Sequence, residues 1–232
     1  MDWQRIQKPA EIAESRLLEA ILSGYYPINS NIPGERDLAE QLGVTRPTLR
    51  EALQRLARDG WIDIQQGKPT RVRDFWREGS MAVLSVLAQS ATHQSPDFVT
   101  HLLDLRVLLA PAYARQAIQA AGSEIAGLLE GYAELEDAPS AFAHADWELH
   151  RLLTQRAANP VFRLLLNSFQ NLYILVGEQY FTFPECRASS RAFYVELLKC
   201  ARSGADCDAE ALTQRVMDES LALWQKMQKE NL

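Results

Sequence analysis

Apolar residues recur with the helical period along most of the chain, and turn-forming residues separate the periodic segments. Residues 9–24 carry one apolar stripe. The first residue of this segment, Pro9, suits a first helical turn, where its missing N–H leaves no intrahelical bond unmade. Gly24 ends the stripe, and a loop rich in Pro, Asn and Ser follows. Two further helices are expected over 35–42 and 46–59, so the chain begins with three short helices.

The third predicted helix has clear end signals and leads into a hairpin. Thr45 is a good N-cap for residues 46–59, and Gly60 provides a left-handed C-terminal cap. Two short strand-like segments follow, 62–64 and 71–73, and between them the chain reads QQGKPT. Two helices joined by a tight Gly-Val-Thr turn, with a helix before them and a hairpin after them, predict a winged helix-turn-helix domain.

From residue 77 onward the pattern is almost continuously helical, and no alternating strand pattern is found. Turn-forming residues interrupt it near 95–96, 121–122, 138–139, 159–160, 183–184 and 203–204. These breaks predict an all-α bundle of six or seven helices, entered by a connecting helix over about 77–91. We therefore expect a mainly α chain with a winged helix-turn-helix domain over 1–76, a connecting helix and linker over 77–95, and a helical domain over 96–232.

Composition places the chain among ordinary globular proteins. Of its 232 residues 47% are hydrophobic and 23% charged, which suffices for a sizeable core. Neither an apolar run of the roughly 18 residues that a membrane helix needs nor a leader pattern is found, so we expect a cytoplasmic protein with no membrane partner. The three cysteines are odd in number and lack a CxxC spacing, which favours reduced thiols over a disulfide framework or a zinc site.

The net charge of −6 is unevenly distributed along the chain. Residues 46–73 hold seven basic and three acidic side chains, a local surplus suited to nucleic-acid phosphates. Arg46 and Arg50 lie one turn apart at the start of the third predicted helix, where a recognition helix contacts guanine edges. A solvated helix face would also explain this arginine pair. The adjacent hairpin favours DNA binding, because it provides a second contact element.

Two stretches carry a resemblance to a known family. PGERDLAEQLGVTRPTLREALQRLARDGWI resembles the N-terminal domain of GntR-family transcription regulators, and LARDGWIDIQQGKPTRVRDFW resembles their fatty-acid-responsive, acyl-CoA-binding branch. The resemblance implies a homodimer on palindromic operator DNA. Pro47 replaces a hydroxyl residue of that branch, and Gln66 stands in place of a wing-tip histidine. The operator contacts that the resemblance implies are Arg36, Thr45, Arg46, Thr48, Arg50, Gln66, Gly67 and Lys68.

The resemblance also raises the question of a metal. Many GntR regulators hold a metal with an Asp, a His four residues on and two later histidines. Asp146 and His150 match the first half of this pattern, but Tyr194 and Asp218 occupy the later positions. The set is incomplete, so we expect a hydrogen-bonded pair on one helix face and no metal or other cofactor.

The effector is expected to bind within the helical domain. Residues 159–185 read as one long helix with apolar residues on several faces, which indicates a buried helix or the wall of a cavity. The resemblance implies that long-chain acyl-CoA binds here and releases operator DNA. It also implies repression of fatty-acid degradation and possible activation of unsaturated fatty-acid synthesis. Met217 stands in place of a glycine that allows close ligand approach. The ligand residues implied are Arg106, Tyr180, Tyr194, Ser220 and Trp224.

Two other functions are weighed against this one. A GntR regulator could instead sense a small carboxylate through a metal held by Asp146 and His150. An enzyme such as an acyl-CoA hydrolase is disfavoured, because the chain has no GxSxG elbow, no glycine-rich phosphate loop and no Cys/His pair at a catalytic spacing.

Overall fold

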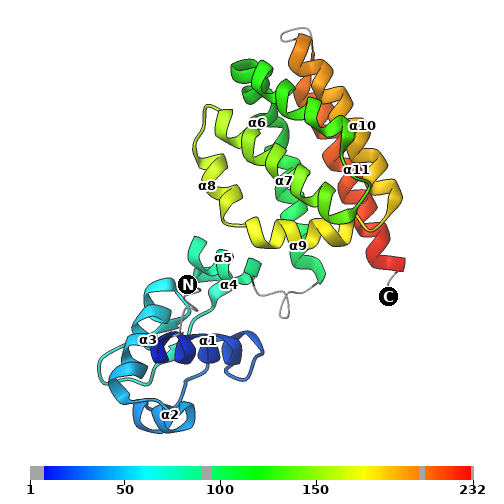
Figure 1. Cartoon of the computed structure of the whole chain (residues 1–232). Helices are drawn as coiled ribbons and strands as arrows, with labels where there is room; N and C mark the ends of the chain where they lie inside the picture. Colours follow the sequence, from blue (N-terminus) through cyan, green and yellow to red (C-terminus); the bar gives the residue numbers. More distant parts are fainter. Residues whose placement is uncertain (1–7, 90–95, 204–206, 231–232) are drawn as a thin grey trace, which may run out of the picture. The chain divides into compact units, whose positions relative to one another are not determined.

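The computed structural model describes residues 8–89, 96–203 and 207–230 (Figure 1). The chain divides into two compact units, residues 1–93 and 94–232, and each has its own packed interior. Within the described residues, none of the helices combines the length and apolar character needed to cross a bilayer.

The N-terminal unit consists of short helices and one small hairpin. Helices α1 and α3 pack against each other, and α2 packs on α3. Leu17, Leu49 and Leu56 lie between these helices with at most 2% of their surface exposed, as the helical period predicts. The elements are α1 (Pro9–Leu22), α2 (Glu35–Leu42), α3 (Arg46–Asp59), β1 (Ile62–Asp63), β2 (Arg71–Val72), α4 (Phe75–Glu78) and α5 (Met81–Gln89).

The ends of α2 and α3 are set by local signals. Gly43 and Gly60 follow the two helices with φ of 68° and 98°, in the left-handed region that favours glycine. Thr45 caps α3, and its hydroxyl oxygen accepts the backbone N–H of Thr48 at 3.4 Å. The predicted boundaries of these helices are confirmed.

The predicted hairpin is also present. Strands β1 and β2 are antiparallel, with Ile62 opposite Val72 and Asp63 opposite Arg71. Trp61, just before β1, is 1% exposed, and the centre of its ring lies 5.1 Å from that of Phe75. These buried contacts hold the base of the hairpin against the unit, while residues 65–70 extend from it as a loop.

The expectation of one connecting helix over 77–91 is wrong within the described residues. The structure has two short helices, α4 and α5, which are separated at Gly79 and Ser80. Asp74 caps α4 by accepting the backbone N–H of Arg77, and Ser80 Oγ accepts the backbone N–H of Ala82 at the start of α5. These caps start two helices where the apolar pattern alone indicated one. Residues 90 and 91 lie outside the described residues.

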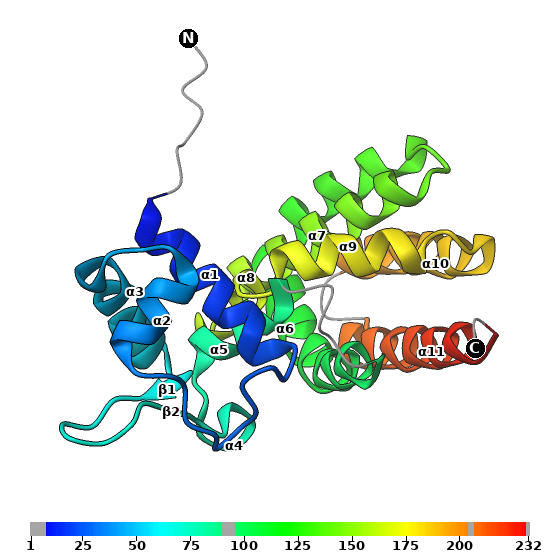
Figure 2. The same cartoon turned by 90° about the horizontal axis from the view of Figure 1, so that it is seen from below.

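The C-terminal unit is an all-α bundle. Its described residues form six α-helices and one 3₁₀ helix, so the predicted fold class is confirmed. The long helix α6 packs against α7, α10 and α11, and α10 and α11 lie side by side (Figures 1 and 2). The elements are α6 (Pro96–Glu130), η1 (Gly131–Glu134), α7 (Pro139–Arg156), α8 (Val161–Asn167), α9 (Gln170–Tyr180), α10 (Pro184–Ser203) and α11 (Ala209–Glu230).

The break predicted near 121–122 is a kink within α6. Ala121 has φ of −148° and ψ of 37°, which interrupts the helical backbone. A Cβ atom at Gly122 would lie 2.6 Å from the carbonyl oxygen of Ala201. Glycine at this position therefore allows α6 and α10 to approach each other closely.

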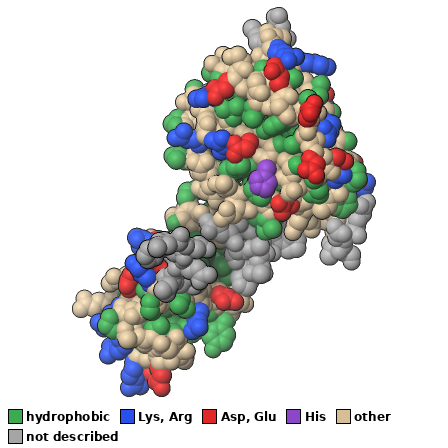
Figure 3. All heavy atoms as spheres, in the orientation of Figure 1, with side chains coloured by type: hydrophobic (Ala, Val, Ile, Leu, Met, Phe, Trp, Pro, Cys, Tyr) green, Lys and Arg blue, Asp and Glu red, His purple; other side chains and the backbone are tan. Residues whose placement is uncertain are grey.

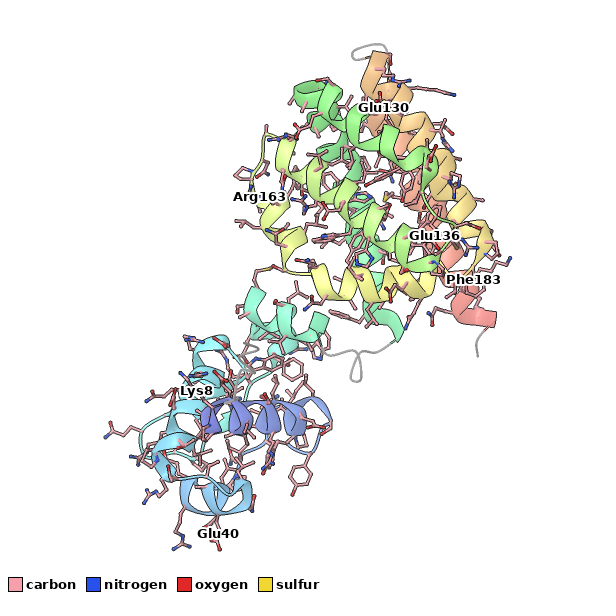
Figure 4. The ribbon with its side chains drawn as sticks, in the orientation of Figure 1. Lys8, Glu40, Glu130, Glu136, Arg163 and Phe183 are labelled. Carbon is pink, nitrogen blue, oxygen red and sulfur yellow. A yellow bond between two sulfur atoms is a disulfide. The ribbon has the colours of Figure 1, made fainter. Side chains whose placement is uncertain are left out.

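The apolar segment 159–185 differs from its prediction. It forms two helices, α8 and α9, with a break at Ser168 and Phe169. No residue of α8 is buried, and Leu172 is the one buried residue of α9. In Figure 4, Arg163 marks α8 and Phe183 marks the turn that follows α9. The segment is therefore not one buried helix, but the alternative expectation of a cavity wall is confirmed, because many of its apolar residues line a cavity.

The expectation that all three cysteines are reduced is also wrong. Cys200 and Cys207 form a disulfide, with their Cα atoms 5.1 Å apart, and Cys186 is a buried free thiol. Cys200 lies in α10 and Cys207 lies just before α11. An odd number of cysteines does not exclude one such pair, because one thiol is then left over.

Candidate functional site

Two arginines at the start of α3 share one carboxylate. Arg50 Nε donates a hydrogen bond to Glu35 Oε2 at 2.8 Å, and Arg46 Nη2 lies 3.8 Å from the same oxygen. Both arginine side chains remain more than half exposed. Glu35 is the first residue of α2, so the ion pairs link the two helices and hold both guanidinium groups at the surface.

The other predicted contacts around the turn between α2 and α3 have different surroundings. The Thr45 and Thr48 hydroxyl oxygens lie 2.9 Å apart, so one hydroxyl donates to the other at the first turn of α3. Arg36 is 85% exposed, and its Nε donates to the carboxylate of Asp37 at 3.0 Å. These side chains are accessible to a ligand that approaches the start of α3.

The hairpin loop presents polar groups and one cation. Gly67 has φ of 75°, in the left-handed region, and a Cβ atom built there would meet no other atom within 4 Å. Lys68 Nζ donates to Gln65 Oε1 at 2.8 Å, and Gln66 is exposed. Lys and Arg side chains, drawn in blue, lie along the edge of the N-terminal unit in Figure 3. The loop therefore has the open backbone and charge that close approach to a phosphate requires.

The C-terminal unit contains a largely apolar cavity of about 130 Å³. Its wall comes from α6, α7, α8, α9 and α11. Phe162, Leu166 and Phe169 are among the apolar side chains that α8 and the turn after it contribute. The exposed, apolar α8 is thus explained by its position on the wall of this cavity.

A buried ionic cluster adjoins the cavity. Arg106 Nη2, on α6, donates to Asp146 Oδ2 at 2.8 Å and to His150 Nε2 at 2.7 Å, both on α7. The hydroxyl groups of Tyr173 and Tyr194 donate to the same carboxylate at 2.6 and 3.2 Å. The carboxylate therefore has three donors, which offset the cost of burying its charge.

Burial sets the charges of this cluster. Burial and, to a smaller extent, the nearby charge of Arg106 lower the pKa of His150, and together they outweigh the opposite effect of Asp146. The resulting pKa is about 3, so the imidazole is neutral near pH 7. Burial alone would raise the pKa of Asp146. The charge of Arg106 and the tyrosine hydrogen bonds outweigh burial and hold that pKa below its ordinary value. The cluster thus contains one cation and one anion.

The cluster does not fit a metal ion. The Arg106 guanidinium contacts both side chains of the Asp146–His150 pair, so a cation already lies where a metal would bind. Tyr194 bonds to Asp146, whereas Asp218 is exposed and accepts a hydrogen bond from Gln214. Within the residues that the structure describes, no group of three or more His, Cys, Asp or Glu side chains could hold a metal.

The structure brings most of the predicted ligand residues to one cavity. Arg106, Tyr180, Ser220 and Trp224 all line it. Tyr194 does not line the cavity, but its hydroxyl donates to Asp146, which does line it. Met217 is 3% exposed, packs in the core and is likewise absent from the cavity wall.

Several donors on the cavity wall lack a partner. Arg106 Nε, the Tyr180 hydroxyl and Trp224 Nε1 are buried with no hydrogen-bond acceptor among the described residues. Ser220 and Cys186 lie beside the Tyr180 hydroxyl but do not meet hydrogen-bond geometry with it. Unpaired buried donors are costly, so their gathering at one cavity indicates a ligand that carries acceptor oxygens.

Two tyrosines of the site were not predicted. Tyr113 lies on α6 seven residues after Arg106, two helical turns along the same face, and this spacing could have indicated it. Tyr173 lies on α9 and reaches Asp146 on α7, a pairing that has no local sequence signal. Both line the cavity.

The two units match two known domain families. Residues 9–72 match the family described as bacterial regulatory proteins, gntR family, and residues 73–231 match the FadR C-terminal domain. The chain is also similar to curated proteins named fatty acid metabolism regulator protein. The relative from Klebsiella pneumoniae is 37% identical over 225 residues, which cover 97% of this chain and 94% of the relative. The relative from Shewanella denitrificans is 39% identical over 219 residues, which cover 94% and 92%.

Solved structures show a similar fold. A regulator described as controlling the Listeria monocytogenes agr system aligns with a TM-score of 0.50 and 16% identity, covering 96% of this chain and 99% of that chain. At this identity the likeness shows the fold alone.

Proposed function

The chain belongs to the GntR family of bacterial regulatory proteins and carries the FadR C-terminal domain, and we propose that long-chain acyl-CoA releases it from operator DNA. It is a DNA-binding regulator and not an enzyme. In this proposal it controls fatty-acid metabolism in the bacterial cytoplasm. It represses degradation genes and activates genes of unsaturated fatty-acid synthesis.

The proposed DNA contact rests mainly on the start of α3. Arg46 and Arg50 keep exposed guanidinium groups there, and a bidentate arginine contact to guanine contributes about 1–3 kcal/mol of discrimination. The Thr45 and Thr48 hydroxyls and the first-turn amides would hold phosphates, because the positive end of the helix dipole favours anions. Arg36 would add a contact from α2.

The hairpin loop would form the second DNA contact. Lys68 can neutralise one phosphate, and the open left-handed Gly67 lets the backbone approach the duplex. Gln66 is exposed and can both donate and accept hydrogen bonds at base edges in the minor groove. Gln66 is therefore the residue of the loop through which operator preference would differ from that of relatives with histidine.

The cavity supports the proposed effector. Its wall is mostly apolar, as an acyl chain requires, and its unpaired donors suit the oxygens of a CoA thioester. We assign Ser220 and Trp224 to the CoA portion, with Arg106 and Tyr180 nearby and Tyr194 acting through Asp146. A cavity of about 130 Å³ resembles one of about 150 Å³ that holds a single benzene molecule, so a long chain requires the wall to move. Helices α8 and α9 are the parts of the wall with the fewest buried residues.

The proposal includes a homodimer. Two-fold symmetry places two recognition helices on two half-sites of a palindrome. Acyl-CoA releases DNA if it binds better to the dimer arrangement in which the two helices do not match the half-sites.

The proposal is tested by titrating the protein onto a palindromic site selected from a random DNA pool, with and without oleoyl-CoA. We expect sequence-specific binding that oleoyl-CoA weakens and free CoA does not. Tyr180→Phe is the matched variant, because it removes only the unpaired hydroxyl of a cavity residue. It should keep the DNA affinity and reduce the response to oleoyl-CoA. If oleoyl-CoA leaves DNA binding unchanged while a small carboxylate with a divalent metal lowers it, the effector assignment is wrong.

A further inference from the structure

The hydrogen bonds around His150 determine where its proton lies. The ring is fully buried and neutral, so one nitrogen carries a hydrogen and the other accepts. Nε2 lies 2.7 Å from Arg106 Nη2, and Nδ1 lies 2.7 Å from the Tyr113 hydroxyl oxygen. A guanidinium can only donate hydrogen bonds. His150 Nε2 must therefore accept, and Nδ1 must carry the hydrogen.

This tautomer has a consequence for Tyr113. Since Nδ1 donates, the Tyr113 oxygen accepts, and its own hydroxyl hydrogen is not used by His150. No other polar partner of this hydroxyl is found among the described residues, and the side chain lines the cavity. Burial raises the pKa of Tyr113, so the hydroxyl keeps its hydrogen near pH 7.

We infer that the Tyr113 hydroxyl, oriented by His150, and Arg106 Nε together form a donor site for the carbonyl oxygen of the acyl ligand. This inference deepens the proposed function and rests on it. Arg106 Nε is buried without a partner on the same cavity wall, and Arg106 Nη2 is the group that fixes the imidazole. One arginine thus supplies one donor and, through His150, sets the direction of the second.

The charge of the site favours a neutral acceptor. The positive charge of Arg106 is balanced by Asp146 at 2.8 Å, and His150 is uncharged. A free carboxylate would add a second buried anion to a balanced pair, which is costly. A thioester carbonyl accepts the same hydrogen bonds without charge, so the site selects a thioester over the free acid.

The simpler alternative is that Tyr113 only supports the imidazole. The two roles differ in what the ligand must contain. A support role affects all ligands of the cavity equally, whereas a donor role affects only ligands with a carbonyl group. A thioether analogue, in which a CH₂ group replaces the thioester carbonyl, therefore separates them.

The test compares the affinities for oleoyl-CoA and the matched S-alkyl-CoA thioether in the wild type and in Tyr113→Phe. We expect the wild type to prefer the thioester, and the variant to lose about 2- to 12-fold of affinity for the thioester and none for the thioether. Tyr132→Phe is the matched control, because its hydroxyl donates to the Ala145 carbonyl at 2.6 Å and does not line the cavity. That variant should keep the preference.

A second measurement needs no variant. The ¹⁵N shifts of His150 in the wild-type protein should show a protonated Nδ1 and an unprotonated Nε2, and the opposite tautomer overturns the inference. Equal wild-type affinity for thioester and thioether overturns it too, as does a Tyr113→Phe variant that weakens both ligands equally or neither. In these cases binding of oleoyl-CoA still supports the proposed function. A wild type that binds neither ligand refutes the proposed function together with the inference.

Discussion

At the scale of single residues, Arg50 and Arg58 are two exposed arginines of α3 that should contribute differently to DNA binding. Arg50 lies near the start of the helix and is held by Glu35, whereas Arg58 lies in the last turn beside Asp59. Arg50→Ala should reduce specific operator binding by about 1–3 kcal/mol, because the proposed base contact would be lost. Arg58→Ala removes the same charge from the other end of the helix and should keep the ratio of specific to non-specific affinity.

Competition titrations with operator and scrambled DNA at one salt concentration measure this ratio. A drop of equal size for both variants would mean that Arg50 contributes charge alone. The base-reading role assigned to the start of α3 would then be wrong.

His150 should make stability depend on pH. In the unfolded state the pKa of His150 is near 6.5, whereas in the folded state it is about 3. Below pH 6.5 the unfolded state therefore gains a proton that the folded state excludes. The free energy of unfolding should fall as pH is lowered from 7 to 5, by about 2 kcal/mol. Asp146 has a depressed pKa in the folded state, so its protonation reduces stability only at a pH below the range from 7 to 5.

Urea denaturation at pH 7 and pH 5 checks this expectation. His150→Gln keeps an acceptor for Arg106 and a donor for Tyr113 but does not titrate, so most of the pH dependence should disappear. His144→Gln is the control, since that histidine is exposed and bonds only to the Ser140 carbonyl. An unchanged slope in His150→Gln would contradict the assignment of a neutral, buried imidazole.

At the scale of elements, the N-terminal unit could be predicted well because its signals are local. Thr45, Gly43 and Gly60 each act within one helical turn of the boundary they set, and the leucine stripe of α3 faces the core as its period requires. The two short strand-like segments on either side predicted the loop 65–70. None of these inferences needs a contact between distant parts of the chain.

The C-terminal unit was predicted less completely, because its site is built from distant contacts. Arg106 meets Asp146 and His150 across 40 and 44 residues, and no spacing rule indicates that pairing. The break between α8 and α9 falls at Ser168 and Phe169, where neither Gly nor Pro marks it. The apolar residues of 159–185 left a buried helix and a cavity wall as alternatives, because residues that line a cavity carry the same pattern as residues in a core.

The same two helices should be the least stable part of the bundle. α8 has no buried residue, whereas α7 buries nine, including Phe142 and Leu153. Amide hydrogens of α8 and α9 should therefore exchange faster than those of α7, because few buried contacts oppose local opening.

Oleoyl-CoA should slow exchange in α8 and α9 and leave exchange in α7 nearly unchanged. Hydrogen exchange with mass spectrometry measures both, and free CoA serves as the control ligand. Exchange in α8 as slow as in α7 without ligand would argue against wall opening at these helices.

At the scale of the whole molecule, charge is divided between the two units. Residues 46–73 have four more basic than acidic side chains, although the chain carries a net charge of −6. The acidic remainder should limit non-specific binding to DNA, so specific contacts at α3 and the loop 65–70 contribute most of the discrimination. In the proposed dimer, operator binding would depend on the placement of the two DNA-binding units, and the effector would change that placement without touching DNA.

Linkage makes this coupling testable from the ligand side. If oleoyl-CoA lowers operator affinity by some factor, operator DNA must lower oleoyl-CoA affinity by the same factor, because both describe one coupling free energy, commonly about 1–3 kcal/mol. Calorimetry with the free protein and with the operator-bound protein should give equal factors in both directions. Scrambled DNA at matched concentration should leave oleoyl-CoA affinity unchanged.

Oleoyl-CoA is a surfactant, and non-specific denaturation would also release DNA. Unequal factors would point to irreversible denaturation, because an irreversible process is not bound by linkage. Equal factors are expected for two sites coupled at equilibrium.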